Sequence, residues 1–366
     1  MRFTAVLLMA GAIVFAGSSC SLVRPFVRLR ENSAGAQPGR VLHGAGFLRE
    51  TVFLSDSRLR SVNDLRWGNH LSLGGPKLCV VDSHGALFAD GKGSVLSYVP
   101  FPGTYFKPSI VEVPGREDCE FLSHGELIAR PALLGHDGRV LWTYGGFLPR
   151  VGDTAAGDID GDGQNEFVVG SAGGGGVHLL DARGRTRWDK PDQGVWQVAI
   201  ADVGGTGHRQ IIHTDAEGKI VLRDRNGRVQ SRAWGPVRLR HFALCRWPDR
   251  RSPVRVITAR QGALWVLDGE AALVATLPAP DNSQWRLQAT LVKLKPGKGD
   301  FFAVYVAGPY SGSMLYVYDP ARELVYQEVF SRLYGAIAAM PSGKGDTETL
   351  LLAATGKVWR YDLAAR

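Results

Sequence analysis

The chain has 366 residues, of which 45% are hydrophobic and 21% are charged, and its formal net charge is +8. This apolar fraction excludes bulk disorder, and so modest a charge without a clustered basic stripe argues against nucleic acid as the partner. The 46 glycines indicate many tight turns, which favours an all-β fold.

The first 20 residues have the pattern of an export signal. Arg2 begins a short positive region, residues 3–15 are almost wholly apolar, and small residues lead to Cys20. The apolar run is too short to span a bilayer comfortably, so we expect a cleaved signal over residues 1–19 instead of an anchor helix.

This segment resembles a bacterial lipoprotein signal, which implies lipidation of Cys20 and a membrane anchor. Ser21, where Asp would retain such a protein, is similar to the signal for sorting to the outer membrane. Gly17 departs from the motif, which prefers Leu there, so a soluble periplasmic or secreted protein is the alternative. Residues 20–45 are expected to form a lipid-anchored linker.

Three cysteines remain after Cys20, namely Cys79, Cys119 and Cys245. In an oxidising compartment this odd number permits one disulfide and one spare thiol. Their spacing does not indicate a metal cluster, and we favour small buried side chains in strands.

A turn motif recurs about every 45 residues and is the main signal of the sequence. An apolar run leads to Asp, two further residues and often Gly, and then a second alternating run begins. The seven anchor positions are Asp90, Gly135, Asp181, Asp224, Asp268, Asp319 and Asp362.

Within a unit the apolar pattern alternates with a period of two, and about four strands fit. Four-stranded units of this length are typical of a β-propeller, whereas the coils of a β-solenoid are shorter. We therefore predict seven four-stranded blades within residues 46–366. Their approximate bounds are 70–105, 106–148, 149–192, 193–235, 236–280, 281–331 and 332–366.

The last unit ends too early to supply an outer strand of its own. An apolar segment at residues 50–54 precedes the first unit. Because an open sheet edge must be paired or covered, we predict that this N-terminal strand joins the last blade and closes the ring.

One loop in the third unit carries the residues of a cation site. Carboxylates recur at Asp158, Asp160, Asp162 and Glu166, Gly163 lets the backbone bend, and the carbonyl of Gln164 is free to face inward. Such an oxygen-rich loop suits Ca²⁺, because Mg²⁺ demands a stricter octahedron and transition metals prefer His or Cys. The alternative is a solvated turn without an ion.

The loop resembles the calcium motif of the integrin-like FG-GAP/VCBS repeat family, whose members are typically β-propellers. The resemblance implies one Ca²⁺ bound by Asp158, Asp160, Asp162, Gln164 and Glu166. The second and third units also resemble quinoprotein-type repeats, in which tryptophans such as Trp142 and Trp188 dock adjacent blades.

Loops at the same place in three other units carry a basic residue where the third unit has Asp162. We expect these loops to hold no ion, with each basic side chain paired to a nearby acid; exposed turns with unpaired charges are the alternative. The pairs are Arg116 with Glu120, Lys298 with Asp300, and Lys344 with Glu348.

Five further tryptophans are expected mostly to pack between blades. They are Trp196, Trp234, Trp265, Trp285 and Trp359.

The sequence shows no nucleophile elbow, zinc-protease motif or phosphate-binding loop, so we expect no catalysis. A non-catalytic envelope scaffold that binds a protein partner is favoured, comparable in general plan to propeller lipoproteins of outer-membrane assembly. A carbohydrate-binding propeller and a quinone-cofactor-dependent dehydrogenase are the alternatives. The pocket residues expected for either are not visible in the repeats, and the partner-binding residues are unknown.

Overall fold

The computed structural model describes residues 39–69, 74–124, 130–146, 148–234, 239–260, 262–280, 286–308, 312–330 and 335–364. The expected signal peptide, Cys20 and most of the linker lie outside these residues. The described part of the chain consists of strands, turns and bends. It contains no helix with the length and apolar character needed to cross a bilayer.

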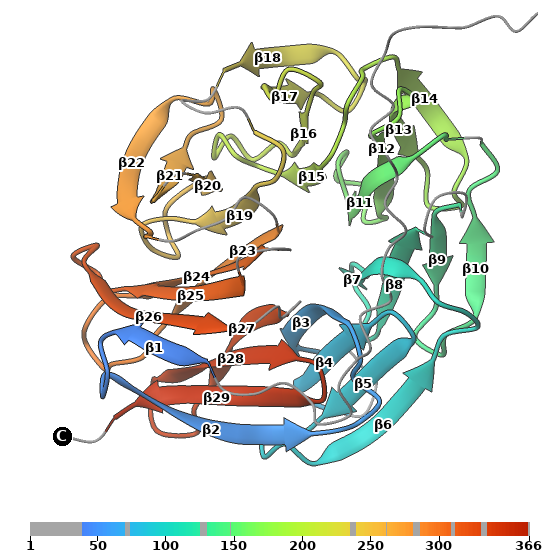
Figure 1. Ribbon diagram of the computed structural model, residues 1–366. Coiled ribbons are helices and arrows are strands. Elements are labelled where there is room, and N and C mark those ends of the chain that lie inside the picture. The colour runs from blue at the N-terminus through green and yellow to red at the C-terminus, as the bar shows by residue number, and fades with distance from the viewer. Residues whose placement is uncertain are drawn as a thin grey trace, which may run out of the picture. The chain divides into compact units, whose positions relative to one another are not determined.

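The described strands form seven antiparallel sheets arranged in a ring (Figure 1), which confirms the predicted seven-bladed β-propeller, and a central channel lies between their inner strands. Blade 1 contains β3 (Val62–Gly68), β4 (Lys77–Asp82), β5 (Gly85–Ala89) and β6 (Val95–Pro100). Blade 2 contains β7 (Phe106–Glu112), β8 (Cys119–His124), β9 (Ala132–Leu134) and β10 (Val140–Thr143). Blade 3 contains β11 (Val151–Gly157), β12 (Glu166–Ser171), β13 (Gly176–Leu180) and β14 (Thr186–Lys190).

The remaining blades follow the same plan. Blade 4 contains β15 (Val198–Ala201), β16 (Gln210–Thr214), β17 (Ile220–Arg223) and β18 (Val229–Ala233). Blade 5 contains β19 (Ala243–Arg246), β20 (Val254–Arg260), β21 (Ala263–Leu267) and β22 (Leu273–Pro278). Blade 6 contains β23 (Arg286–Val292), β24 (Phe301–Gly308), β25 (Gly312–Tyr318) and β26 (Leu324–Phe330). Blade 7 contains β27 (Ala336–Pro341), β28 (Glu348–Ala354) and β29 (Lys357–Leu363).

The N-terminal strand closes the ring, as predicted. Strand β2 (Leu48–Ser55) pairs antiparallel with β29, so that Leu48 lies opposite Leu363, and it forms the outer strand of blade 7. A shorter strand, β1 (Arg40–His43), pairs with β26 and adds a fifth strand to blade 6. The sequence did not indicate this second addition.

The Asp and Gly of the repeated turn have separate structural roles. Asp224 Oδ1 accepts backbone hydrogen bonds from Asn226 (2.9 Å) and Arg228 (2.8 Å), which holds the turn between two strands. Gly184 has a φ of +74°, and a Cβ atom there would lie 2.6 Å from the ring of Trp142 in the preceding blade. The turn therefore requires glycine both for its backbone and for close packing between blades.

Trp142 and Trp188 both contact the following blade, as the quinoprotein-type pattern implies. The ring of Trp142 meets Phe167 edge-on with centroids 5.0 Å apart, and Trp188 Nε1 donates to the carbonyl of Arg225 at 2.9 Å. These contacts join the outer strand of one blade to the blade that follows it.

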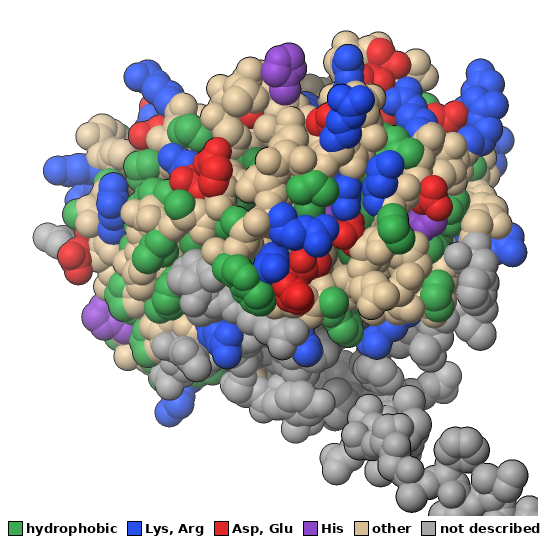
Figure 2. All heavy atoms as spheres, turned by 90° about the horizontal axis from the view of Figure 1, so that it is seen from above, with side chains coloured by type: hydrophobic (Ala, Val, Ile, Leu, Met, Phe, Trp, Pro, Cys, Tyr) green, Lys and Arg blue, Asp and Glu red, His purple; other side chains and the backbone are tan. Residues whose placement is uncertain are grey.

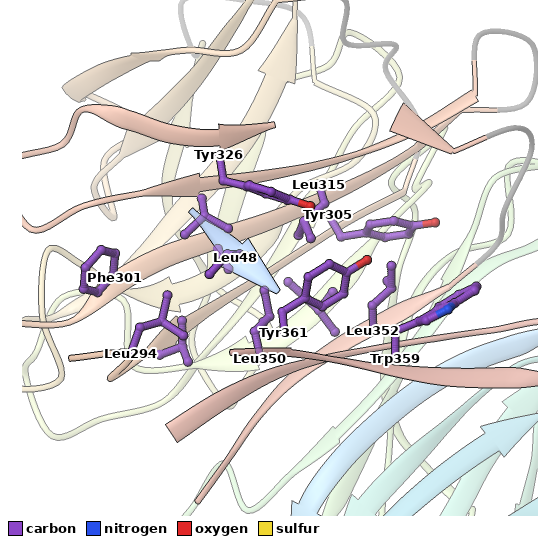
Figure 3. Packing of buried hydrophobic residues seen from close by; sticks show 14 of the residues in the cluster. Leu48, Leu294, Phe301, Tyr305, Leu315, Tyr326, Leu350, Leu352, Trp359 and Tyr361 are labelled. Atoms are coloured by element: carbon purple, nitrogen blue, oxygen red, sulfur yellow. The ribbon is translucent and has the colours of Figure 1, made fainter. Parts of the chain in front are cut away.

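The core consists of apolar clusters between adjacent blades. In the cluster between blades 6 and 7, Leu48 from β2 lies among side chains from both sheets, including Tyr326 and Tyr361 (Figure 3). Trp359 is fully buried here, as expected. Each sheet thus removes its apolar faces from water only because its neighbours cover them.

The three described cysteines are free thiols. Cys79 and Cys119 are buried, and burial followed by the neighbouring Cys119 raises the pKa of the Cys79 thiol. The favoured interpretation, buried side chains in strands, fits both residues.

Polar side chains connect consecutive inner strands around the channel. Gln197 Oε1 accepts from the Phe242 amide (2.7 Å), and Asp64 Oδ2 accepts from the Ile110 amide (2.9 Å). Because each blade is an antiparallel meander of four strands, its outer strand returns the chain to the end at which its inner strand began, so the inner strands all run in the same direction. We call the end of the channel where they begin the leading end and the end where they finish the trailing end.

Candidate functional site

The acidic loop of the third unit connects β11 to β12, at the trailing end of the channel. Asp158 organises the loop, because its two carboxylate oxygens accept backbone hydrogen bonds from Gly161 (2.7 Å) and Gly163 (3.0 Å). Both glycines have positive φ angles, 82° and 83°, which glycine adopts without strain. The local sequence therefore folds the loop back on itself.

This turn gathers three of the four predicted carboxylates. Oxygen atoms of Asp158, Asp160 and Glu166 all lie within 4.8 Å of one another. Asp162 is outside this cluster, because its carboxylate accepts from the backbone and the side-chain amide of Gln164, at 2.8 and 3.4 Å. Three of the five predicted ligands therefore lie close enough to bind one ion. The other two, Asp162 and Gln164, hydrogen-bond to each other.

Arg187 on β14 neutralises part of this acidic cluster. Its guanidinium lies 2.8 Å from Asp160 and 3.3 Å from Glu166. The hydrogen bond from Arg187 lowers the pKa of Asp160. Burial raises the pKa of Glu166, although its bonds with Arg187 and the Ile159 amide oppose that effect.

The donor set fits a hard cation. Ca²⁺ binds oxygens at about 2.3–2.6 Å, so two ligands of one ion lie at most about 5 Å apart. The three gathered carboxylates satisfy this limit. They are all oxygen donors, with no imidazole or thiolate that would favour a transition metal.

In the equivalent loop of blade 2, an arginine neutralises the carboxylates. Arg116 lies 2.8 Å from Asp118 and 3.3 Å from Glu120. The predicted pair of Arg116 with Glu120 is therefore confirmed.

The other two predicted pairs are wrong. Asp300 and Glu348 both bind Arg250, at 3.1 Å for Asp300, instead of Lys298 and Lys344. Arg250 follows β19 in blade 5, and its long side chain reaches the acids of the next two blades. The sequence of each loop alone could not reveal Arg250, because Arg250 is distant in sequence from both acids.

The channel contains a cavity of about 810 Å³, whose lining extends from Gln197 and Phe242, just before β15 and β19, to the trailing end. Arg66 lines it and lies 3.5 Å from Asp64 and 3.6 Å from Glu112. Arg250 and Glu348 form part of the same wall. This end of the channel thus pairs its cations with carboxylates.

Two of the tryptophans differ from the expected packing between blades. Trp234 is 57% exposed, and the ammonium of Lys219 lies 4.6 Å from its ring centroid. Trp196 lies beside two arginines at the leading end of the channel. The spacing of Arg150, Trp196 and Arg240, at matching positions of consecutive units, was the signal that could have revealed this group.

No protein-family model matches the chain, and no curated protein sequence matches it. Solved structures do match over most of its length. BBS1N, crystallised in complex with ARL6DN, has 15% identity and a TM-score of 0.56, over 90% of this chain and 98% of that one. The Pan2 WD40 domain of Neurospora crassa has 11% identity and a TM-score of 0.52, with the same coverage of 90% and 98%. A chain of the mitotic checkpoint complex has 17% identity and a TM-score of 0.51, over 98% and 100% of the two chains. At these identities the comparisons show the class of fold, a β-propeller, and leave the function to be argued from the surface.

Proposed function

We propose that this protein is a non-catalytic, calcium-stabilised binding scaffold of the cell envelope, whose ring presents rigid surfaces to a protein partner. The observation that carries the binding role is a set of adjacent apolar side chains on outer strands, exposed by between 38 and 50%. They are Val95 and Leu96 on β6, Val140 and Leu141 on β10, and Leu273 and Val274 on β22. Apolar side chains exposed together favour association.

Blade 6 supports this role, because its outer edge already binds an added strand, β1. Strand β1 pairs with Gln327, Glu328 and Val329 of β26, and His43 Nε2 lies 2.9 Å from the Leu324 carbonyl oxygen, so the outer edge of this sheet is occupied. In the described residues β6, β10 and β22 each end their sheet, so their outer edges offer backbone groups to a further strand. A partner segment that pairs like β1 would lie alongside the exposed apolar residues of these strands.

Two of the similar structures support a protein partner. BBS1N was crystallised in complex with ARL6DN, and another similar chain belongs to the mitotic checkpoint complex. The envelope location rests on the signal-like residues 1–19 and on Cys20, the predicted lipid anchor.

The calcium role rests on the gathered oxygens of Asp158, Asp160 and Glu166. Bound Ca²⁺ would supply charge neutralisation between the end of β11 and the start of β12. Because the ion binds the folded loop and not the unfolded chain, it would stabilise the ring by mass action.

Photo-crosslinking in the native cells tests the binding role. A crosslinking residue replaces Leu141 or Leu273, and the matched control replaces Asp189, an exposed residue on the outer strand of blade 3. We expect one discrete protein adduct from position 141 or 273 and none from 189. No adduct at either apolar position, or the same adduct at all three, would contradict binding at these outer strands.

The calcium role is tested by Asp160→Ala. With Ca²⁺ present, we expect the melting temperature to fall by several degrees, because a gathered ligand is lost. With chelator, the variant should melt near the wild type, since Asp160 then loses mainly a partly exposed ion pair with Arg187. Equal losses in both buffers would show that the loop matters for another reason.

A further inference from the structure

The leading end of the channel carries two arginines on one aromatic ring. The guanidinium carbons of Arg150 and Arg240 lie 4.8 and 5.4 Å from the ring centroid of Trp196. These residues precede β11, β15 and β19, so three consecutive blades each contribute one of them. Both arginines are exposed and Trp196 is half-buried.

Neither arginine has an acidic partner among the described residues. The backbone of Trp196 is anchored, because its amide donates to Thr214 Oγ1 at 3.1 Å. Two like charges on one ring repel each other, and each guanidinium keeps its planar set of donors available. Such an arrangement favours an anion that accepts from both.

The positive charge continues into the channel. Lys107 on β7 donates to the Gly152 carbonyl at 3.3 Å, and Arg286 on β23 donates to Asn63 Oδ1 at 3.1 Å. Lys107 has a φ of +46°, a conformation that non-glycine residues rarely adopt. Burial, and then repulsion by Lys107, Arg240 and Arg286, lower the pKa of His241 to about 3.

The two ends of the channel therefore differ in charge balance. At the leading end, Asp153 interacts electrostatically with Lys107 and Arg286, and burial raises the pKa of its own carboxyl. At the trailing end, Arg66 and Arg250 each lie beside two carboxylates. The excess positive charge at the leading end points to a ligand that brings negative charge.

We propose that the leading end of the channel, at Arg150, Trp196 and Arg240, binds an acidic peptide segment of a partner protein. Carboxylates accept from the two guanidiniums, and the peptide packs on the exposed part of the indole. The inference rests on the proposed function, since it names the chemistry of a protein partner.

The charge distribution favours a peptide over a nucleic acid. Nucleic acids are held by long tracks of cations along many phosphates. Figure 2 shows instead Lys and Arg side chains interspersed with Asp and Glu over the visible outer wall. The excess positive charge is local, and a short run of carboxylates matches it.

Fluorescence anisotropy with a fluorescein-labelled hexaglutamate peptide tests the proposal on the full chain. Each of Arg150→Glu and Arg240→Glu should weaken binding about tenfold, because each removes a charge-assisted contact. Trp196→Ala should weaken it less. The matched control is Arg183→Glu on the exposed turn after β13, which should change affinity by less than about twofold.

Melting curves of the variants show whether each is folded, and the exposed arginines should leave the melting temperature unchanged. Wild-type binding that Arg150→Glu and Arg240→Glu leave unchanged, or no binding of hexaglutamate, would overturn the proposal. Equal binding of a single-stranded oligonucleotide, lost in the same variants, would replace the peptide with a nucleic acid.

The crosslinking experiment separates this proposal from the proposed function. If the partner adduct at position 141 or 273 forms but hexaglutamate does not bind, the acidic-peptide site is wrong and the scaffold role stands. If hexaglutamate binds at the arginines but no partner adduct forms, the outer-strand scaffold role is wrong.

Discussion

Two groups of carboxylates in this molecule are compensated in opposite ways. In the loop after β11, Asp160 and Glu166 share the guanidinium of Arg187, and the pKa of Asp160 is lowered. Between blades 6 and 7, Glu328 is fully buried and accepts from the Tyr326 hydroxyl at 2.8 Å. Burial there, followed by the charge of Glu328, raises the pKa of Glu50 to about 7.

The difference shows that the position of two carboxylates in a blade decides whether a cation or a proton relieves their repulsion. A loop at the channel end is open to solvent, so a cation, from a side chain or from solution, can neutralise it. A pair between packed sheets has little access to cations, and Lys357 only partly offsets the rise in the pKa of Glu50. Because Glu328 is fully buried and Glu50 is half-buried, this pair favours holding a proton, whereas the loop favours a positive charge.

The test with the largest expected effect compares two loops that have similar backbone hydrogen bonds and different charges. Asp202 in blade 4 accepts from the amides of Thr206 (2.9 Å) and Gly207 (2.8 Å), much as Asp158 accepts from Gly161 and Gly163. In chelator, Asp158→Ala and Asp202→Ala should each lower the free energy of unfolding by about 2 kcal/mol. In Ca²⁺, only Asp158→Ala should show an additional loss.

Denaturant titrations in the two buffers measure this difference. An equal response of both variants to Ca²⁺ would remove the distinction between the loops.

The next test addresses the buried pair. The pKa of Glu50 rises from 4.5 to about 7 on folding, so its favourable contribution is present below pH 4.5 and is lost as the pH rises through 7. Glu50→Gln should therefore be stabilising by about 1 kcal/mol at pH 8 and close to neutral at pH 4.5, after allowance for its partial exposure.

Unfolding measured across this pH range provides the readout, and the exposed Glu270→Gln is the control. A variant whose effect is the same at pH 4.5 and pH 8 would show that Glu50 keeps its ordinary pKa.

The smallest expected effect concerns Arg187. Because this guanidinium competes with a cation for Asp160 and Glu166, Arg187→Gln should tighten Ca²⁺ binding about threefold. Calorimetric titration measures the affinity, and Arg185→Gln, whose partner is Asp181, is the control. Weaker Ca²⁺ binding by Arg187→Gln would mean that the arginine supports the site.

The sequence predicted the ring because its signals are local and repeated. Turns such as that at Asp224 recur with each blade, and residues 50–54 had no other sheet to join. The acidic loop was also found from its spacing. Arg187 and Arg250 were not, because they reach their carboxylates from another strand or another blade. Contacts of this kind depend on how blades face one another, which a single repeat does not encode.

The pairing of β2 with β29 has a consequence for biosynthesis. Ser55 Oγ donates to the Gly356 carbonyl, and these residues are 301 positions apart, so the first of them leaves the ribosome long before its partner exists. Until Lys357–Leu363 has been translated, Leu48–Ser55 has no strand to pair with in its sheet. The ring is therefore closed only after Lys357–Leu363 has been translated, and a chain that terminates before these residues is left with an exposed strand that proteases and chaperones can recognise.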